Sequence, residues 1–498
     1  MKNRLGKLVI VGCLVFLVAS GFAVNETAEK PVTGETEEKM IPPPPSRPML
    51  RGIWIASWGD GILNPGQCKE LVDTVRASNL NAIFPEVRKV GDAYYIKGFE
   101  PRASNIKGGG DFDPLQYLID LCHDTSDGKR YIEVHAWLVT FRLWRKSMGE
   151  FPEGHMFKKH PETIMLTADG KDNKDSTMFA DPGHPMTEEW TARVFRNLAE
   201  KYDIDGIHHD YVRYPEYEGD WGYNKVSLER FRKKTGFQGK PAGDNPMWQA
   251  WRRQQVANTV RRVYAEVTEV NPDCLVSAAT LNWGLETDPW KWRSGTPRMK
   301  AQQDWVRFMK EGALDLNCVM NYSRHKTQPD RFPDYTDLAV RTRWDRHAII
   351  GPGVYLNTVE DGFAQIRQAI EMGADGVMLY AWGGLTNDKT VTRKQYFERL
   401  KKEIFPEPVD LPARPWKDDP VYGSIIGRVT DQSGKWLEDV LVTLDGVEPA
   451  LTDGTGFYSF FRVDPGEHTV SFRDEKGKTM RKNSKLEVGK TVRIDVKM

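Results

Sequence analysis

The sequence predicts an α/β (β/α)8 TIM barrel followed by a small all-β immunoglobulin-like sandwich. Over residues 49–404, short apolar runs alternate with amphipathic segments of helical spacing, as in a parallel sheet covered by helices. Over residues 421–498, short alternating runs are divided by Gly, Asp and Pro, as in an antiparallel sandwich. At 498 residues the chain is long enough for one large domain with accessory segments.

The N-terminal segment is expected to direct the chain out of the cytoplasm. Residues 1–23 combine a basic start, an apolar run and small residues at Gly21 and Ala23, which predicts a secretory signal peptide. In an alternative interpretation, Cys13 at the end of an Ile-Val-Gly-Cys run carries a lipid anchor. Residues 24–48 are acidic and then Pro-rich, so they are expected to form an extended linker. No later segment approaches the roughly 18 apolar residues of a transmembrane helix.

Eight barrel strands are predicted, together with helices in most of the gaps between them. The strands begin at Arg51, Asn81, Tyr131, Asp205, Leu275, Asp315, Ala348 and Asp375. The helical patterns cover residues 66–78, 113–122, 187–203, 245–269, 299–312 and 359–373. Asp205 and Asp375 each form an Asp-Gly turn before an apolar strand, so we expect them at the N-terminal, stabilising end of the barrel.

The amino-acid composition limits the classes of molecule that the protein is expected to bind. Lys+Arg and Asp+Glu both number 70, and zero net charge argues against a nucleic-acid partner. The chain has 16 Trp and 17 Tyr, whose rings can stack on sugars. The four cysteines beyond the signal segment have no CxxC spacing, so buried free thiols are expected and no metal or cofactor is predicted. Asp169, Asp172 and Asp175 are spaced like a loose calcium loop without its glycine and glutamate, which favours a solvated loop.

The segment DGIHHDYVRYP, residues 205–215, carries charged and imidazole side chains on a predicted buried strand. Strand alternation places Gly206, His208 and Asp210 on one face. Burial of such groups without partners costs several kcal/mol, so they are either paired core residues or part of a cleft. The polar residues that end the other strands favour a cleft.

Active sites of such barrels form at the C-terminal ends of the strands, where this chain has polar and aromatic residues. The candidate substrate-binding residues are Trp58, His135, Trp137, His208, Arg213, Trp283, Asn321, Tyr322 and Trp382. Indole and phenol rings would stack on sugar rings, while imidazole and amide groups would hydrogen-bond sugar hydroxyls. Each residue alone could equally be a core residue, but the set favours a glycan-binding cleft.

Glycoside hydrolysis requires an ionised carboxylate beside the anomeric carbon and a protonated acid beside the leaving oxygen. Asp210 is the candidate for the first role, with His208 and Arg213 expected to keep it ionised. Glu86 is the candidate acid because its flanking residues are apolar, with Glu286 and Asp92 as alternatives. An ion pair between Glu86 and an arginine would be a purely structural role for that residue.

Five motifs occur in order along the barrel segment: RGIWIASW, GDAYY, HAWL, DPGHP and DGIHHDYVRYP. Together they resemble the glycosyl-hydrolase-like 10 family of bacterial envelope proteins over residues 49–404. This resemblance implies a TIM-barrel glycosidase in the bacterial envelope, either secreted, periplasmic or at the cell surface. Gly206, His208 and Asp210 also occupy the places of the Gly-x-Arg-x-Asp motif of α-amylase-type barrels. Beyond the Pro-rich linker of residues 405–420, residues 421–498 resemble carboxypeptidase regulatory-like domains.

Two functional hypotheses follow. In the first, the protein is a secreted or surface-anchored glycoside hydrolase that cleaves a polysaccharide, with cell-wall glycan as one candidate substrate. In the alternative, the same rim binds glycan without cleaving it, and the protein is a catalytically inactive glycan-binding or envelope-scaffold protein. A second carboxyl group within about 10 Å of Asp210 is the geometric requirement that separates them.

Overall fold

The computed structural model describes residues 42–172, 176–216, 219–284 and 291–498. The predicted signal peptide, the lipid-anchor position Cys13 and the candidate acid Glu286 lie outside the described residues. Within the described ranges, no helix is long and apolar enough to cross a membrane.

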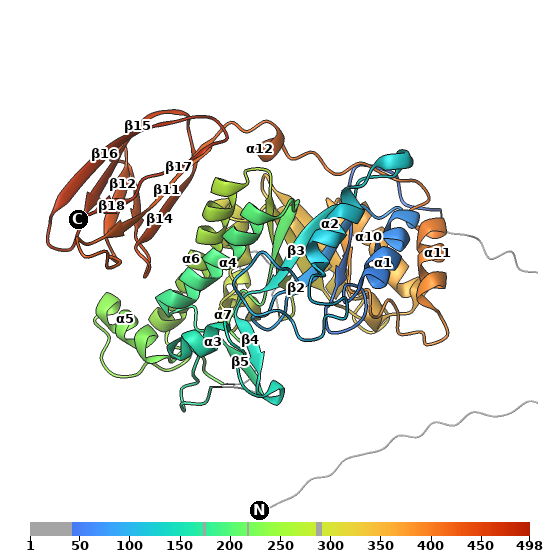
Figure 1. Cartoon of the computed structure of the whole chain (residues 1–498), viewed down its shortest axis with the longest axis horizontal. Helices are drawn as coiled ribbons and strands as arrows, with labels where there is room; N and C mark the ends of the chain where they lie inside the picture. The colour runs from blue at the N-terminus through green and yellow to red at the C-terminus, as the bar shows by residue number, and fades with distance from the viewer. Residues whose placement is uncertain (1–41, 173–175, 217–218, 285–290) are drawn as a thin grey trace, which may run out of the picture. The chain divides into compact units, whose positions relative to one another are not determined.

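Eight parallel strands close into a barrel, which confirms the predicted fold class (Figure 1). The strands are β1 (Leu50–Ile55), β2 (Ala82–Arg88), β3 (Glu133–Val139), β6 (Gly206–Asp210), β7 (Leu275–Leu281), β8 (Leu316–Asn321), β9 (His347–Pro352) and β10 (Gly376–Leu379). Each strand pairs with the next one in this order, and β10 pairs with β1 to close the barrel.

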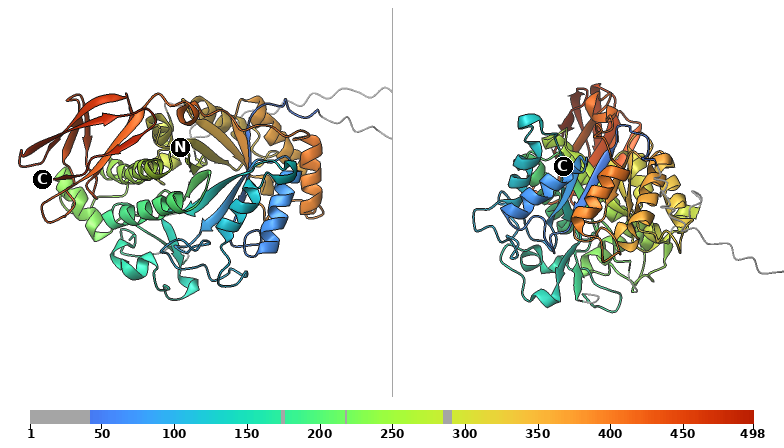
Figure 2. Two further views of the ribbon diagram at one scale, coloured as in Figure 1. Left: turned by 45° about the horizontal axis from the view of Figure 1, so that its top comes forward. Right: turned by 90° about the vertical axis from the view of Figure 1, so that its right-hand side faces the viewer.

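Helices follow the strands and surround the barrel (Figure 2). They are α1 (Pro65–Ala77), α2 (Pro114–His123), α4 (Pro185–Lys201), α6 (Pro246–Val270), α8 (Trp305–Glu311), α9 (Arg331–Arg341), α10 (Val359–Glu371) and α11 (Arg393–Glu403). Four of them begin with proline after a residue whose side chain accepts a backbone N–H, namely Asn64, Asp113, His184 and Asn245. The sequence prediction missed α9 and α11, because their exposed faces leave few apolar positions.

Additional elements lie in the connections after β3, β6 and β7. They are α3 (Met156–Lys159), α5 (Lys225–Thr235), α7 (Thr296–Met299) and a hairpin of β4 (Arg142–Arg145) and β5 (Thr177–Phe179). The hairpin was not predicted, since its strands are short and lie in a long connection. It brings an additional strand pair beside the C-terminal end of the barrel, where its residues join the candidate site described below.

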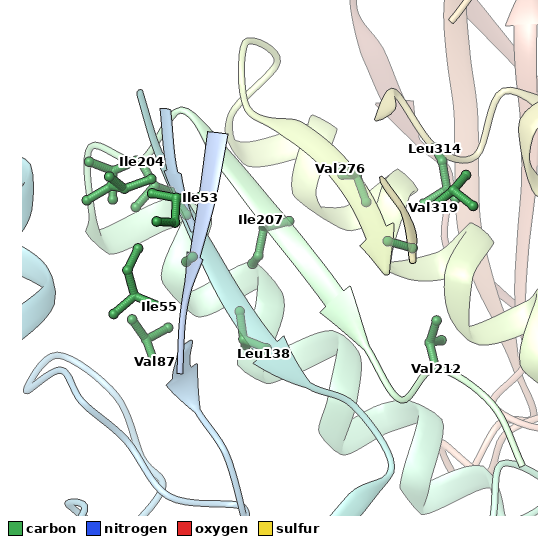
Figure 3. Close-up of a cluster of buried hydrophobic side chains, with 14 of the residues drawn as sticks. Ile53, Ile55, Val87, Leu138, Ile204, Ile207, Val212, Val276, Leu314 and Val319 are labelled. Carbon is green, nitrogen blue, oxygen red and sulfur yellow. The ribbon is translucent and has the colours of Figure 1, made fainter. Parts of the chain in front are cut away.

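Strand residues alternate between the barrel lumen and the helical shell, as predicted for residues 206–210. Trp54, Phe84 and Trp137 pack in the lumen cluster, and His208 contacts all three rings. On the other face, Ile207 belongs to the large cluster between strands and helices, part of which is drawn in Figure 3. The face of β6 that carries His208 and Asp210 is therefore the inner one.

The N-terminal end of the barrel is held by a repeated hydrogen bond. The residue before each even-numbered strand of the barrel accepts the backbone N–H of the preceding strand through its side-chain oxygen. The four pairs are Asn81 with Arg51 (2.7 Å), Asp205 with Val134 (2.7 Å), Asp315 with Val276 (2.8 Å) and Asp375 with Ala348 (2.9 Å). The predicted location of Asp205 and Asp375 at the stabilising end is confirmed, and Asn81 and Asp315 share their role.

Replacement of Asp205 by alanine should destabilise the barrel. The substitution leaves the buried N–H of Val134 without an acceptor and removes the bonds to Tyr131 (2.6 Å) and His123 (2.9 Å), at a cost of about 1–3 kcal/mol. Urea unfolding of the variant measures this cost. The neighbouring Asp203, whose side chain is 91% exposed, provides the matched control, and its alanine variant should unfold like the wild type.

The C-terminal segment forms two four-stranded sheets, as predicted for a sandwich. One contains β11 (Gly423–Thr430), β14 (Phe457–Val463), β17 (Thr491–Arg493) and β18 (Val496–Lys497). The other contains β12 (Leu441–Leu444), β13 (Glu448–Leu451), β15 (Gly466–Arg473) and β16 (Thr479–Leu486). Their inward-facing residues share one apolar core.

The Pro-rich segment before the sandwich, which includes α12 (Pro415–Asp418), is hydrogen-bonded to the N-terminal end of the barrel. Arg51 donates to the carbonyl of Glu407 (2.7 Å), and Arg414 pairs with Glu133 (2.7 Å) at the start of β3. Burial opposes ionisation of Glu133, but its bonds to His135 and Arg414 outweigh burial and lower its pKa to about 2. The linker therefore supplies the counter-ion of a buried carboxylate.

Candidate active site

Four side chains form the uppermost layer of the barrel lumen. They are the last inward-facing residues of alternate strands, which is how layers form in such barrels: Glu86 on β2, Asp210 on β6, Tyr322 after β8 and Tyr380 after β10. The rings of Tyr322 and Tyr380 are 5.2 Å apart. Burial raises the pKa of both phenols, and the charge of Asp210 raises them further. Two carboxyl groups and two phenols thus share one layer at the C-terminal end.

Asp210 is surrounded by N–H donors. Its Oδ1 accepts the backbone N–H of Tyr211 (2.7 Å) and an N–H of Arg213 (3.3 Å), while its Oδ2 accepts the indole N–H of Trp137 (3.3 Å). Arg213 is itself buried and also bonds to Glu216 (3.2 Å). Three donors directed at one carboxyl group fix its orientation.

Glu86 lies in a different environment. Its Oε2 accepts the backbone N–H (2.9 Å) and the hydroxyl (3.0 Å) of Ser57, whereas its Oε1 forms no hydrogen bond with any described residue. Burial raises the pKa of this carboxyl group to about 7, and the nearby charge of Asp210 contributes in the same direction. Around pH 7, Glu86 is therefore protonated in a large fraction of molecules.

The two carboxyl groups lie on strands separated only by β3. Two inter-strand spacings place the main chains of β2 and β6 about 10 Å apart, and both side chains point into the lumen. Trp137 lies between them, as the register partner of Glu86 on one side and of His208 on the other. The two carboxyl groups therefore face the same part of the lumen from strands on either side of β3.

The structure corrects the predicted role of His208. It lies below the upper layer, where its Nε2 accepts the indole N–H of Trp54 (3.1 Å) and its Nδ1 bonds to Ser277 (2.8 Å). Burial lowers its pKa well below the usual value, so the ring is neutral. His208 cannot keep Asp210 ionised by its charge, and it supports the floor of the site without reaching a ligand.

Three further predicted residues are buried polar groups of the fold. His135 stacks on Phe84 (4.3 Å between ring centroids) and bonds to Glu133 (3.1 Å) in the lower half of the lumen. Asn321 donates to the carbonyl of Phe332 (2.9 Å) in α9. Asp92 accepts the backbone N–H groups of Lys89 and Val90 within its own turn. None of the three faces the layer of Glu86 and Asp210.

The four tryptophans predicted to bind substrate differ in their exposure and in what they contact. Trp58, 43% exposed, lies beside Ser57 at the rim, and Trp283 packs half-buried against the lumen cluster. Trp137 is buried but reaches Asp210. Trp382 is a shell residue under α11, 2% exposed and packed on Phe397, so it is not available for sugar stacking.

Cys68, Cys122, Cys274 and Cys318 are buried free thiols, as expected from their spacing. Among the residues described, no group of three or more His, Cys, Asp and Glu side chains is placed to hold a metal ion.

Comparison with known families identifies the barrel. The family model described as Glycosyl hydrolase-like 10 matches residues 49–342, more than half of the chain. The chain belongs to the glycosyl hydrolase-like 10 family. A second model, for the carboxypeptidase regulatory-like domain, matches residues 424–498. Both matches confirm the resemblance stated from the sequence motifs.

Relatives of this glycosyl hydrolase-like 10 protein carry hydrolase names. Glycosyl hydrolase YngK of Bacillus subtilis (strain 168) is 27% identical over 460 residues, which cover 83% of this chain and 83% of YngK. Glycosyl hydrolase DigH of Escherichia coli (strain K12) is 23% identical over 331 residues, or 57% of this chain and 70% of DigH.

Two solved structures share the fold of the glycosyl hydrolase-like 10 barrel. The glycoside hydrolase domain of PgaB (BpsB) from Bordetella bronchiseptica has a TM-score of 0.53 at 13% identity, covering 72% of this chain and 99% of that domain. The catalytic domain of β-amylase from Paenibacillus polymyxa has a TM-score of 0.51 at 13% identity, with 72% and 98% covered. At these identities the similarity shows the fold alone.

Four rim residues of this glycosyl hydrolase-like 10 protein were not among the predicted site residues: Arg142, Tyr211, Tyr355 and Tyr380. Strand alternation assigns Tyr211 to the outer face, but its left-handed backbone (φ 48°) ends the alternation and turns its ring. The guanidinium of Arg142 lies 3.8 Å from the centroid of that ring. Tyr355 contacts both Tyr322 and Tyr380 (5.8 and 5.7 Å). The signal available in the sequence was the clustering of tyrosines directly after strands.

Proposed function

We propose that this protein is a glycoside hydrolase that cleaves a polysaccharide, with Glu86 as general acid and Asp210 as the ionised partner. One observation carries the proposal: two carboxyl groups share the upper lumen layer in unlike environments, Glu86 buried against Ser57 with a raised pKa and Asp210 held by three N–H donors. This is the division of roles that an oxocarbenium-like transition state requires.

The hydrogen bonds of Glu86 support a separate task for each of its oxygens. Ser57 holds Oε2 through two hydrogen bonds, so Oε1 is the oxygen available to the glycosidic leaving oxygen. As the glycosidic bond breaks, the proton of Glu86 moves to that oxygen, and a water molecule then adds to the anomeric carbon and gives up a proton, so that the acid is restored. Asp210, held by three N–H donors, stabilises the positive charge that develops at the anomeric carbon.

Tyrosines and one tryptophan supply the surface for the sugar. Tyr355 is 36% exposed beside the half-buried Tyr322 and Tyr380, and Trp58 is exposed beside the acid. The buried hydroxyl of Tyr322 has no hydrogen-bond partner in the described structure, so it is available to a sugar hydroxyl. Rings with hydroxyl groups at the edge of a carboxylate layer are suited to bind pyranose units.

We further propose that the substrate lies outside the cytoplasm, in the bacterial envelope, with cell-wall glycan as the first candidate. The signal-like pattern of residues 1–23 supports export. The relatives YngK and DigH, both named glycosyl hydrolases, support the reaction class.

A polysaccharide panel tests the proposed function. Wild-type protein is incubated with cellulose, xylan, chitin, pectin and bacterial cell-wall glycan, and new reducing ends are counted. At least one polymer should be cleaved, and the doubly substituted Glu86→Gln, Asp210→Asn protein should cleave none. Binding without release of reducing ends by the wild type would support the alternative of an inactive glycan-binding protein.

Substitution of Trp137 by phenylalanine should slow catalysis without unfolding the barrel. Phenylalanine fills most of the same volume but removes the N–H that bonds to Oδ2 of Asp210, and a hydrogen bond to a charged group contributes about 1.5–3 kcal/mol. We expect kcat to fall about tenfold or more at nearly unchanged KM. The measurement is steady-state kinetics on the polymer that the panel identifies.

A further inference from the structure

We propose that the hairpin strand β4 recognises negative charge on the polysaccharide, through the guanidinium groups of Arg142 and Arg145. The inference rests on the proposed function for the location of the cleft, and it names the substrate class as an acidic glycan. Two observations support it. Both arginines lie over aromatic rings at the rim, and neither side chain forms a hydrogen bond or ion pair with a described residue.

Arg142 is a half-buried cation that forms no ion pair within the described residues. Its guanidinium lies over the ring of Tyr211, and its Nε is buried with no hydrogen-bond partner. No hydrogen bond or ion pair joins its side chain to any described residue, although its charge is felt by Glu86. A guanidinium removed from water without a partner loses solvation that an anionic ligand would restore.

Arg145 repeats this arrangement at the other end of β4. Its guanidinium lies 4.4 Å from the ring centroid of Trp58, and within the described chain it has no hydrogen-bond partner. Trp58 follows Ser57, the residue that holds Glu86. The strand therefore reaches from the aromatic ring beside Asp210 to the one beside Glu86.

An irregularity in β4 places both arginines on the same side of the hairpin. In a regular strand, residues three apart point to opposite faces. Here the pairing with β5 shifts between Arg142 and Trp144, which inserts one residue, and such a bulge redirects side chains. Trp144 is accordingly buried against Phe151, while Arg142 and Arg145 contact rim aromatics.

Arg213 provides the contrast within the same site. It also stacks on Tyr211, at 4.0 Å, but its charge is matched by Asp210 and Glu216. The site therefore contains an arginine used internally and two whose donors are left for a ligand. Guanidinium groups bind carboxylates in a bidentate manner, which favours sugars that carry carboxylate groups.

Binding to charged polymers and their neutralised forms tests the inference. The probes are polygalacturonate, hyaluronate and bacterial cell-wall glycan, each before and after esterification or amidation of its carboxyl groups. Affinities are measured by isothermal titration in the Glu86→Gln, Asp210→Asn background, so that cleavage does not interfere. The background should prefer at least one acidic polymer to its neutral form by tenfold or more, and adding Arg142→Gln and Arg145→Gln should abolish this preference.

Arg193→Gln is the matched control, since Arg193 also lies over an aromatic ring, Phe99 at 5.0 Å, but on α4; it should keep the preference. Equal affinity for charged and neutral forms of all three polymers, absence of binding to all three, or a preference that survives loss of both arginines would overturn the inference. Charge-dependent binding by a protein that cleaves no polymer would instead refute only the hydrolase function.

Discussion

Replacement of Asp210 by asparagine is expected to reduce kcat/KM on the cleaved polysaccharide by about 10³- to 10⁴-fold, or ~4–5 kcal/mol of transition-state stabilisation. Asparagine keeps the size of the side chain but removes the negative charge that faces the developing oxocarbenium ion. Tyr211, Trp137 and Arg213 all donate hydrogen bonds to the carboxylate. In the variant, the NH2 group of asparagine would face one or more of these donors, so hydrogen bonds would be lost as well. The loss should appear mainly in kcat, since the charge is needed most in the transition state.

The control for this substitution is Asp60→Asn. Asp60 is a rim carboxylate after β1 that is largely exposed and paired with Arg393 (2.9 Å). Its variant should retain activity within about twofold, as is usual for an exposed ion pair. Undiminished activity of Asp210→Asn would remove Asp210 from the mechanism.

Replacement of Glu86 by glutamine is expected to abolish acid catalysis and to stabilise the fold at alkaline pH. The amide has no proton to give to the leaving oxygen, so kcat on the polysaccharide should fall by about 10²- to 10⁴-fold. Ser57→Ala should reduce kcat less than this. Alanine at position 57 loses only the hydroxyl bond to Oε2 and keeps the backbone N–H bond.

The gain in stability follows from the raised pKa of Glu86. Burial raises this pKa from 4.5 to about 7, so the native state binds the proton more tightly than the unfolded chain does. Wild-type stability therefore decreases as pH rises from about 4.5 to 7, by on the order of 3 kcal/mol, and stays at the lower level above that range. Glutamine does not titrate, so the variant avoids this loss.

Urea unfolding at two pH values measures the effect. At pH 8 the Glu86→Gln protein should be more stable than the wild type by about 2–3 kcal/mol. At about pH 3.5, below the ordinary pKa of 4.5, Glu86 is largely protonated in both states, and the two proteins should differ little. An equal difference at both pH values would show that Glu86 does not titrate as described.

The strands were predictable from the sequence because buried parallel strands require continuous apolar runs. The helices α9 and α11 were not, because their polar outer faces hide the few residues that pack on the barrel, among them Phe332 and Phe397. Tertiary contacts rather than helical periodicity define these two helices.

The sequence predicted which face of its strand each site residue lies on, but not how close to the rim of the barrel it lies. A period of two assigns His208 to the face of Asp210, and His135 to that of Trp137, but it does not say which lies at the rim. Both histidines lie lower in the lumen, where His208 bonds to Trp54 and Ser277 and the Nε2 of His135 bonds to Glu133. Glu86 and Asp210 were identifiable because both are carboxylates near the C-terminal ends of predicted strands, Glu86 with apolar neighbours and Asp210 close to Arg213.

The positions of residues in the long connections between strands and helices could not be predicted from the sequence. Arg142 and Arg145 lie in the insertion after β3, and their contacts with Tyr211 and Trp58 depend on how that hairpin folds over the rim. Tyr211 was assigned to the wrong face because a left-handed residue interrupts the alternation.

The pH dependence of kcat/KM for wild type and Glu86→Gln tests the pairing of Glu86 with Asp210 most directly. The two groups interact, so the profile reports macroscopic pKa values of the pair. For the wild type, we expect activity to decline above an apparent pKa near 7 as Glu86 loses its proton. In Glu86→Gln, the residual activity should no longer decline in this range. A decline near pH 7 that persists unchanged in the variant would show that another group is the acid.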